Sequence, residues 1–416
     1  MEEWNPLISV IIPAYNEEKT ICRTVNSLLQ QTYSHFEILI VDDGSTDNMV
    51  AELIRQYDFT PLSRAYCHNG NSIFKSWLAV CNDIHIYLIE KANGGKSSAL
   101  NLGINYCFGK FYACIDADCI FPTNALSGMA WVLNEYGDIA AVGGQVLPKF
   151  NSLNAVIQGE FSVRNLMESY QELEYGMAFR IARPIFDILG TTMLISGAIG
   201  LFRKDVVLEL GGYSSDTVGE DMELVMRIRE YSAKNSLDLA IGYTQDALCF
   251  TEIPWKIGDW IKQRIRWAVG LTDVLREYRS VITDKTSSLL EKLTYCFYLL
   301  FEKFSPHIEA ISIIICIVRK VSGFAIGMIV ATILTQLLLA ILGSIREIRR
   351  ALSKADSALR AILRLLTVLF SFVTMYHLMH AIVRLIAVPY YRIKKFITRD
   401  KSTTWTSPTR EGKFSR

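Results

Sequence analysis

The sequence lacks the marks of several classes of protein. Its nine cysteines are scattered and include no Cys-x-x-Cys pair, which argues against structural zinc and against a disulfide framework. An odd number of unpaired cysteines fits a reducing compartment. The stretch from Met1 to Pro6 is short and partly acidic, so we expect no signal peptide. The 43 basic and 42 acidic residues nearly balance, which gives no overall argument for a nucleic-acid partner.

Apolar residues are what the sequence has in excess. Half of its 416 residues are hydrophobic. The mean hydropathy of +0.22 is high for a purely soluble protein, and the excess lies near the C-terminus. This length leaves room for a large domain and a further part.

The first 150 residues alternate between strand and helix patterns. Strands are expected over residues 7–14, 36–41, 84–89, 111–115 and 139–147, and helices over 46–57 and 123–136. This alternation predicts an α/β domain with a parallel sheet and right-handed crossovers. Residues 60–83 interrupt the pattern, and we predict an insertion loop there with a short helix around Trp77.

One strand stands out because it runs directly into two acidic residues. Residues 111–115 are apolar, and Asp116 and Asp118 follow. Open α/β sheets bind ligands at the carboxyl ends of their strands. Because side chains alternate along a strand, the two carboxylates are expected to point the same way. Such a pair suits a divalent cation that also holds phosphate oxygens, although a solvated turn would have the same pattern.

Polar residues follow three other predicted strands. Tyr15, Asn16 and Glu17 follow the first, Asp43 follows the second, and Lys96 follows the third after a glycine pair. A glycine turn that opens a helix lets backbone amides approach phosphate, and a lysine adds charge. Gathered at one sheet edge, these residues predict a nucleotide-diphosphate site with a metal.

Beyond residue 150 the sequence changes character. Residues 151–189 predict an amphipathic helix that lies against the protein or along a membrane face. Residues 194–203 form a glycine-rich strand pattern, which indicates a close approach to the backbone. Asp221 opens a predicted helix, where a carboxylate favours the helix dipole whether or not it has a further role.

A second helix pattern covers residues 255–278. Gln263, Arg266 and Trp267 share one face of it. An amide, a guanidinium and an indole can bind a phosphate and stack on a sugar ring. The alternative is an interfacial helix that its Arg and Trp side chains anchor to lipid headgroups.

Six motifs, in this order, resemble those of the family 2 inverting glycosyltransferases. The resemblance is to the membrane-embedded β-polysaccharide synthases in particular, which make cellulose, chitin, hyaluronan and poly-N-acetylglucosamine. The motifs are Pro13-Ala14-Tyr15-Asn16-Glu17, Asp42-Asp43-Gly44-Ser45, Asn93-Gly94-Gly95-Lys96, Asp116-Ala117-Asp118, Gly219-Glu220-Asp221 and Gln263-Arg264-Ile265-Arg266-Trp267. Each motif is weak alone, but the ordered set is specific and covers about residues 7–280.

The resemblance implies a GT-A fold, a UDP-sugar donor and a role for each motif. Residues matching Tyr15, Glu17 and Asp43 hold the uridine in that family, with those matching Ala14 and Lys96 in the same donor site. Residues matching Asp116 and Asp118 hold the ribose and a Mg²⁺ or Mn²⁺ ion on the diphosphate. The catalytic base matches Asp221. Acceptor contacts match Ser196, Gly197, Gln263 and Trp267, and Arg266 matches a ligand of the diphosphate.

These parts predict a mechanism. Asp221 takes the proton of the acceptor hydroxyl as attack develops, because a neutral hydroxyl is a poor nucleophile. Charge develops on the leaving UDP, and a metal and Arg266 stabilise it. The family resemblance, and not the sequence pattern itself, implies inversion of an α-linked donor to a β-linked product.

The C-terminal part carries long apolar stretches. Residues 322–343 are uncharged and long enough to cross a ~30 Å hydrocarbon core. Residues 293–318 are a kinked span or an interfacial helix, and 361–390 contain charges that line a polar path or mark a re-entrant pair. The basic loop after Gly343 is expected in the cytoplasm, on the side of the catalytic domain.

We therefore predict three parts in an integral membrane protein. Residues 1–285 form a cytoplasmic GT-A domain that includes interface helices at about 151–190 and 255–280. Residues 286–392 form a transmembrane helical region in contact with membrane lipid, and 393–416 a basic tail. This membrane part is short, which leaves room for an accessory export subunit.

Three functions are weighed. The first is a processive synthase that extends a β-linked hexosamine or hexose polymer. The second is an enzyme that places one sugar on a lipid carrier or a short oligosaccharide. The third is an inactive nucleotide-sugar sensor or membrane scaffold, which would have no physical need for Asp116, Asp118, Asp221 and Arg266 together.

Overall fold

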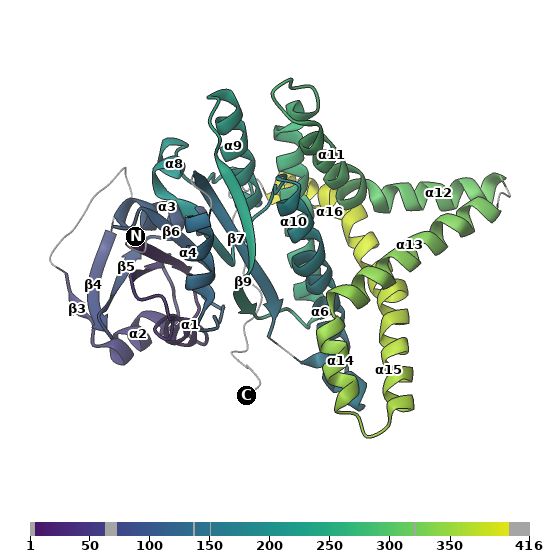
Figure 1. Cartoon of the computed structure of the whole chain (residues 1–416), viewed down its shortest axis with the longest axis horizontal. Helices are drawn as coiled ribbons and strands as arrows, with labels where there is room; N and C mark the ends of the chain where they lie inside the picture. The colour runs from purple at the N-terminus through teal and green to yellow at the C-terminus, as the bar shows by residue number, and fades with distance from the viewer. Residues whose placement is uncertain (1–4, 63–72, 136–137, 150, 320–321, 399–416) are drawn as a thin grey trace. The chain divides into compact units, whose positions relative to one another are not determined.

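The computed structural model describes residues 5–62, 73–135, 138–149, 151–319 and 322–398. These residues form two compact units (Figure 1). Among the described residues, the first unit contains 5–147 and 187–252, and the second contains 148–186 and 253–398. Residues 148–186 of the second unit therefore interrupt the sequence of the first unit.

The first unit is built on a mixed sheet with the strand order β3-β4-β5-β2-β1-β6-β8-β7-β9. The strands are β1 Ile8–Ala14, β2 Phe36–Asp42, β3 Thr60–Pro61, β4 Ile73–Cys81, β5 Ile84–Lys91, β6 Phe111–Ile115, β7 Ile139–Pro148, β8 Ile199–Arg203 and β9 Ala240–Thr251. β5, β2, β1 and β6 pair in parallel, with Ala14 opposite Asp42 and Asp42 opposite Glu90. The predicted α/β domain is confirmed, but the sheet is mixed: β4, β7 and β8 pair antiparallel, so only its centre has the predicted parallel order.

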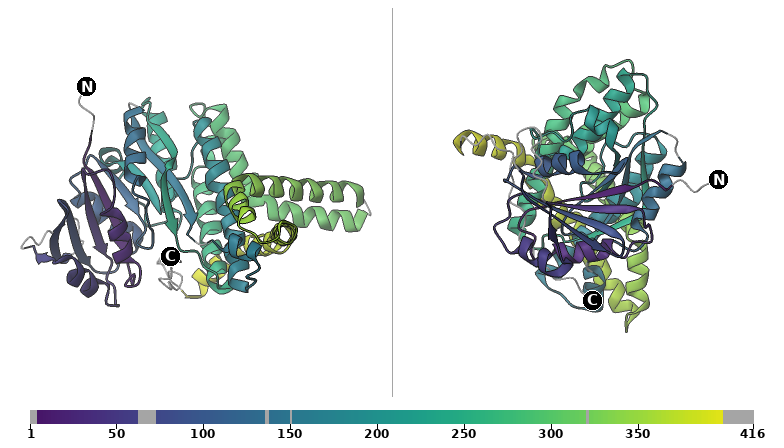
Figure 2. Two further views of the ribbon diagram at one scale, coloured as in Figure 1. Left: turned by 60° about the horizontal axis from the view of Figure 1, so that its bottom comes forward. Right: turned by 90° about the vertical axis from the view of Figure 1, so that its left-hand side faces the viewer.

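Helices cover both faces of this sheet. They are α1 Ile21–Leu28, α2 Met49–Tyr57, α3 Lys96–Tyr106, α4 Ala125–Glu135, α8 Lys204–Glu209 and α9 Glu220–Lys234. α1 and α2 lie on the opposite side of β1 and β2 from α3 (Figure 2, right). At Gly103 of α3, a Cβ atom would lie 2.4 Å from Cγ2 of Ile11, so only glycine lets α3 lie this close to β1.

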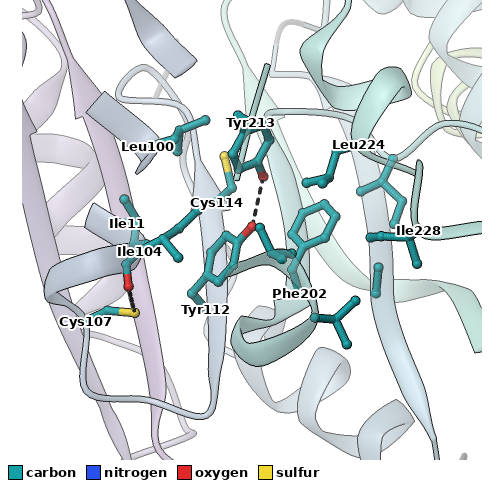
Figure 3. Close-up of a cluster of buried hydrophobic side chains, with 14 of the residues drawn as sticks. Ile11, Leu100, Ile104, Cys107, Tyr112, Cys114, Phe202, Tyr213, Leu224 and Ile228 are labelled. Atoms are coloured by element: carbon teal, nitrogen blue, oxygen red, sulfur yellow. Dashed lines mark hydrogen bonds between the residues drawn. The ribbon is translucent and has the colours of Figure 1, made fainter. Parts of the chain in front are cut away.

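Buried aromatic and aliphatic side chains join α3 and α9 to the sheet (Figure 3). The rings of Tyr112 and Phe202 stack with centroids 5.5 Å apart, and the hydroxyl of Tyr112 donates to that of Tyr213 at 3.4 Å. Burial of each such side chain contributes about 1.5–3 kcal/mol. This core therefore fixes the first residues of both helices, Lys96 and Glu220, above the sheet edge.

The predicted helix around Trp77 is wrong, because residues 73–81 form strand β4. β4 pairs with β5 in an antiparallel hairpin, and the connecting Asn82 and Asp83 have φ angles of 52° and 64°. Two consecutive left-handed residues form the tight turn that suits a hairpin, and Asn and Asp tolerate it. Residues 63–72 of the predicted insertion loop lie outside the described part. The sequence analysis also missed β9.

The second unit is built from helices. They are α5 Ser152–Gln158, α6 Val163–Met177, α7 Arg183–Ile188, α10 Ile257–Glu277, α11 Leu289–Phe297, α12 Ser305–Arg319, α13 Ser322–Gly343, α14 Ile345–Ser353, α15 Ala358–Ser371 and α16 His377–Thr398. The helix predicted over 255–278 is confirmed as α10. The single helix predicted over 151–189 is divided, because Gly159, with a φ angle of 107°, ends α5 and residues 160–162 separate it from α6. α12 and α13 approach each other at the end of α12 and the start of α13 and diverge from there (Figure 1).

One helix, Ala358–Ile393, is long and apolar enough to cross a membrane. Val330–Gly343 and Ile345–Ser353 pass the same test only when they are counted together, and they are bent by 69° at their junction. Both findings rest only on the length and the amino-acid composition of the helices in the described residues.

The bend between α13 and α14 lies against α6. A Cβ atom on Gly176 would lie 2.7 Å from the carbonyl oxygen of Gly343, so the two backbones touch. Arg180 donates to that carbonyl at 2.9 Å and pairs through both of its Nη atoms with Glu347, at 2.6 and 2.7 Å. α6 therefore holds the bend in a defined position.

Candidate active site

The parallel pairing brings the carboxyl ends of β1, β2, β5 and β6 to one edge of the sheet. Most of the residues that the sequence analysis selected in the first unit follow these strand ends. Ser196 and Gly197 precede β8, and Asp221 lies at the start of α9. Their local contacts show what each can do.

The loops after β1 and β2 are tied together. Asn16 adopts a left-handed backbone with φ 56°, and its Oδ1 accepts from the backbone N–H of Thr46 at 2.7 Å. Glu17 is buried and accepts from the hydroxyl of Thr20 at 2.7 Å. Tyr15 keeps 41 % of its surface exposed and can contact a ligand. Asn16 and Glu17 therefore support the loop, and Tyr15 is its available side chain.

Asp43 is the most heavily bonded of the predicted donor residues. Its Oδ1 accepts from Lys91 Nζ at 2.5 Å and from the N–H of Gly94 at 2.9 Å, and its Oδ2 accepts from the N–H of Gly95 at 2.7 Å. The Asp43 and Lys91 side chains are only 5 % and 3 % exposed. A carboxylate offers about four acceptor positions, so one remains for a ligand.

These contacts correct one prediction from the sequence. The N–H groups of Gly94 and Gly95 donate to Asp43, so they are not presented to a phosphate as the glycine pair had suggested. The glycines serve a different purpose, since Gly95 has a left-handed φ of 85° at the start of α3. Lys91 was missed because it ends an apolar strand, where nothing in the sequence shows which carboxylate it meets.

Four predicted residues come together around Lys96. Its Nζ lies 2.5 Å from Oδ1 of Asp116, and both side chains are about one third exposed. Burial opposes the charge of Lys96, but Asp116 raises the pKa of Lys96 above its ordinary value. A Cβ atom on Gly197 would lie 2.9 Å from Lys96 Nζ and 3.8 Å from Asp221 Oδ2, so Gly197 leaves room between the cation and that carboxylate.

Asp221 lies in the first turn of α9 and is held by backbone amides. Its Oδ1 accepts from the N–H of Met222 at 2.8 Å, and its Oδ2 accepts from the N–H of Gly197 at 3.2 Å. The N-terminus of a helix favours a negative charge. Each oxygen keeps an acceptor position, so Asp221 can receive a proton from a hydroxyl near Gly197. Ser196, beside Gly197, is half-buried.

Asp116 and Asp118 have different surroundings. β6 ends at Ile115, so both lie in the turn that follows and the alternation of a strand does not orient them. Asp118 is buried, and its Oδ2 accepts from the hydroxyl of Thr251 at 3.3 Å, a partner that the sequence analysis did not identify.

Carboxylates such as these two are ligands that a divalent cation prefers. No group of three or more His, Cys, Asp or Glu side chains in the described residues could hold a metal on its own. Mg²⁺ commonly binds through one or two carboxylates, substrate phosphates and water, which is the ligand set that Asp116, Asp118 and a diphosphate would provide.

The remaining predicted residues lie on α10, in the second unit. Trp267 is 41 % exposed and Arg266 is half-buried. The buried Oε1 of Gln263 has no hydrogen-bond partner among the described residues. Gln263 can therefore accept a hydrogen bond from a ligand, and the indole of Trp267 can stack on one.

Two family models match the chain. The model described as glycosyl transferase family 2 matches residues 9–210, and that of glycosyl transferase family group 2 matches residues 113–392.

Curated relatives and a solved structure are similar to the chain. A poly-beta-1,6-N-acetyl-D-glucosamine synthase of Staphylococcus epidermidis is 29 % identical over 310 residues, which are 74 % of this chain and 63 % of the relative. The synthase of that name from Staphylococcus aureus strain COL is 28 % identical over 281 residues, 67 % and 58 % of the two chains. The chain thus spans less than two thirds of these relatives.

The structural comparison concerns the fold. The mannosyltransferase PcManGT from Pyrobaculum calidifontis, solved in complex with GDP-Man and Mn²⁺, has a TM-score of 0.53 and 17 % identity. The match covers 95 % of this chain and 89 % of that one. The expected GT-A α/β fold is confirmed.

Proposed function

The chain belongs to the family 2 glycosyltransferases, and from this premise we propose that it transfers a hexosamine or hexose from a UDP-sugar to a growing β-linked polysaccharide. The observation that carries the proposal is the grouping of Lys96, Asp116 and Asp221 around Gly197. It puts a cation for a diphosphate next to a carboxylate that is free to take a proton. The names of the two staphylococcal relatives support a polysaccharide product.

The acceptor hydroxyl loses its proton to Asp221 in this mechanism. The N–H groups of Met222 and Gly197 orient the carboxylate, and each of its oxygens keeps a lone pair that can accept the proton. General base catalysis of this kind contributes about 10²–10⁴-fold to the rate. Attack on the face opposite the leaving UDP inverts the sugar and gives the β-linkage.

The leaving diphosphate needs positive charge as its bond to the sugar breaks. Lys96 supplies it from the first unit, and we assign Arg266 of α10 the same task by family resemblance. Asp43 offers its one remaining acceptor position to the nucleobase, and Tyr15 its ring. Asp116 and Asp118 would hold a Mg²⁺ or Mn²⁺ ion, whose charge neutralises the diphosphate.

The metal assignment predicts a role for Thr251. We expect Thr251→Val to weaken the binding of Mn²⁺ in the presence of UDP by about tenfold, because it removes the hydroxyl that orients Asp118. Calorimetric titration of Mn²⁺ measures this directly, and EDTA is expected to stop turnover. Thr244→Val, also buried on β9, is the matched control and should leave Mn²⁺ affinity unchanged. Equal Mn²⁺ affinity in both variants contradicts the assignment.

We also propose that residues 286–392 associate with the membrane and that residues 1–285 lie in the cytoplasm. The apolar helix Ala358–Ile393 supports this proposal. α14 packs Ile348 and Ala351 against the protein and exposes Arg346, Arg349 and Arg350, a basic face that suits an anionic membrane surface.

The membrane proposal predicts the behaviour of the protein on extraction. We expect the chain to stay in the membrane pellet after washing with alkaline carbonate and with high salt, and to dissolve in detergent, because burial of its apolar helices does not depend on charge. An impermeant thiol reagent should label Ser353→Cys in α14 only from the cytoplasmic side, judged against the unsubstituted chain. Release by carbonate would refute membrane insertion.

UDP release by the detergent-purified protein tests the proposed function. The assay compares a panel of UDP-sugars with Mg²⁺ or Mn²⁺, and every product is then sized. Long polymer from one donor supports the proposal. Single-sugar or lipid-linked products replace it with the non-processive enzyme, and binding of UDP without turnover of any donor replaces it with the sensor or points to a missing subunit.

A further inference from the structure

A buried polar cluster joins three helical segments of the second unit. Arg264 of α10 donates from Nη1 and Nη2 to the two oxygens of Glu174 in α6, at 2.7 Å each. The hydroxyl of Tyr376 donates to Glu174 at 2.6 Å and accepts from Arg264 at 3.3 Å and from Trp260 Nε1 at 3.2 Å. Arg264 is only 3 % exposed. The cluster therefore fixes the plane of the Arg264 guanidinium.

Such a cluster is a costly way to hold helices together. Burial would raise the pKa of Glu174, but Arg264 and the neighbouring donors hold it at about 2, so the pair stays ionised. Apolar residues of similar size often replace a buried ion pair with no loss of stability. An arginine in this position thus suggests a use for the guanidinium beyond the packing of α6 against α10.

Besides Glu174, the Arg264 guanidinium contacts the side chain of Trp267. The guanidinium lies over the ring of Trp267, 4.2 Å from the ring centroid. A planar cation stacked on an indole restricts the rotation of the indole. Trp267 also keeps 41 % of its surface exposed, so one side of a fixed aromatic plate remains available.

We infer that Arg264 is a positioning residue that sets the orientation of Trp267 for stacking on a sugar ring. The inference rests on the proposed function, because it takes the ligand of Trp267 to be the sugar. Glu174 and Tyr376 fix the guanidinium, and the guanidinium fixes the indole. Since Tyr376 belongs to the long apolar helix Ala358–Ile393, the orientation of this contact also depends on that helix.

A double-mutant cycle tests the inference. Arg264→Lys keeps the positive charge but loses the planar guanidinium and its two-point contact with Glu174. We expect it to lower kcat about tenfold while the Kd for UDP changes less than twofold. In a Trp267→Phe background, Arg264→Lys should change kcat less than twofold, because its target is already altered. The same fold-loss in both backgrounds would mean that Arg264 is merely structural and would overturn the inference.

Arg180→Lys is the matched control. Arg180 also binds a glutamate, Glu347, through both Nη atoms in this unit. The described contacts of Trp267 are with Arg264 and not with Arg180. We expect kcat of Arg180→Lys to remain within twofold of the unsubstituted protein. A tenfold loss there would show that any arginine fork in this unit matters equally and would count against a special role for Arg264.

Fluorescence separates this inference from the proposed function. The difference in emission between the protein and Trp267→Phe reports Trp267 alone, and we expect Arg264→Lys to increase its quenching by acrylamide. If no UDP-sugar is turned over, the proposed function fails, yet increased quenching still supports the positioning of Trp267. Unchanged quenching in a protein that turns over its donor overturns the inference alone.

Discussion

Asp221→Asn is expected to lower kcat by about 10²–10⁴-fold while the Kd for UDP changes less than twofold. The amide has nearly the shape of the carboxylate and can still accept from the N–H of Met222 or Gly197. It cannot take the proton of a hydroxyl. The substitution therefore removes the proposed base and leaves the residues assigned to the nucleotide, Asp43, Lys96 and Asp116, in place.

Single-turnover measurement of sugar transfer, together with calorimetry of UDP binding, checks this expectation. Asp216→Asn is the matched control, since Asp216 is an exposed carboxylate in the segment that leads into α9. That variant should transfer sugar at the unsubstituted rate. Full activity of Asp221→Asn would refute the assignment of the base, and loss of UDP binding would show that Asp221 supports the donor site as well.

Asp43→Asn is expected to lower the free energy of unfolding by about 3–5 kcal/mol, because it leaves the buried ammonium of Lys91 without its counter-charge. The amide also has only one oxygen for the N–H groups of Gly94 and Gly95, whose turn opens α3. Lys96 lies at that helix start, so UDP binding should be lost along with stability.

Denaturant unfolding of four variants, Lys91→Met alone among them, measures the effect. Adding Lys91→Met to Asp43→Asn removes the buried ammonium that Asp43→Asn leaves unpaired. We expect the double variant to recover at least half of the lost stability, without recovery of UDP binding. Asp47→Asn, in the same loop, is the control and should unfold within about 0.5 kcal/mol of the unsubstituted protein. Additive losses in the double variant would contradict the proposed coupling of Asp43 and Lys91.

The parallel centre of the fold could be predicted because its strands are runs of apolar residues. β1, β2, β5 and β6 lie within two residues of their predicted ends, as does the antiparallel β7. β4 could not be found this way, since Lys75 and Ser76 break its apolar run. The Asn82-Asp83 pair was the available signal, because both residues tolerate the left-handed conformation of a hairpin turn.

The site could be predicted residue by residue, but not contact by contact. The motifs selected Asp43, Lys96 and Asp221. The structure places Asp43 after β2 at the sheet edge, and Lys96 and Asp221 beside Gly197. They gave no indication of Lys91 or Thr251, whose roles depend on which carboxylate each meets in the folded chain. They also directed attention to Gln263, Arg266 and Trp267, and passed over Arg264 between them.

The strand order has a consequence for synthesis on the ribosome. β7 precedes β8 in the sequence, yet β8 lies between β6 and β7 in the sheet. β7 therefore has no paired neighbour in the sheet when it emerges, and it stays unpaired until β8 at residues 199–203 has been made. A growing chain exposes this apolar strand for the whole interval, when an unpaired strand is prone to aggregate. We expect a chaperone to protect the nascent protein at this stage.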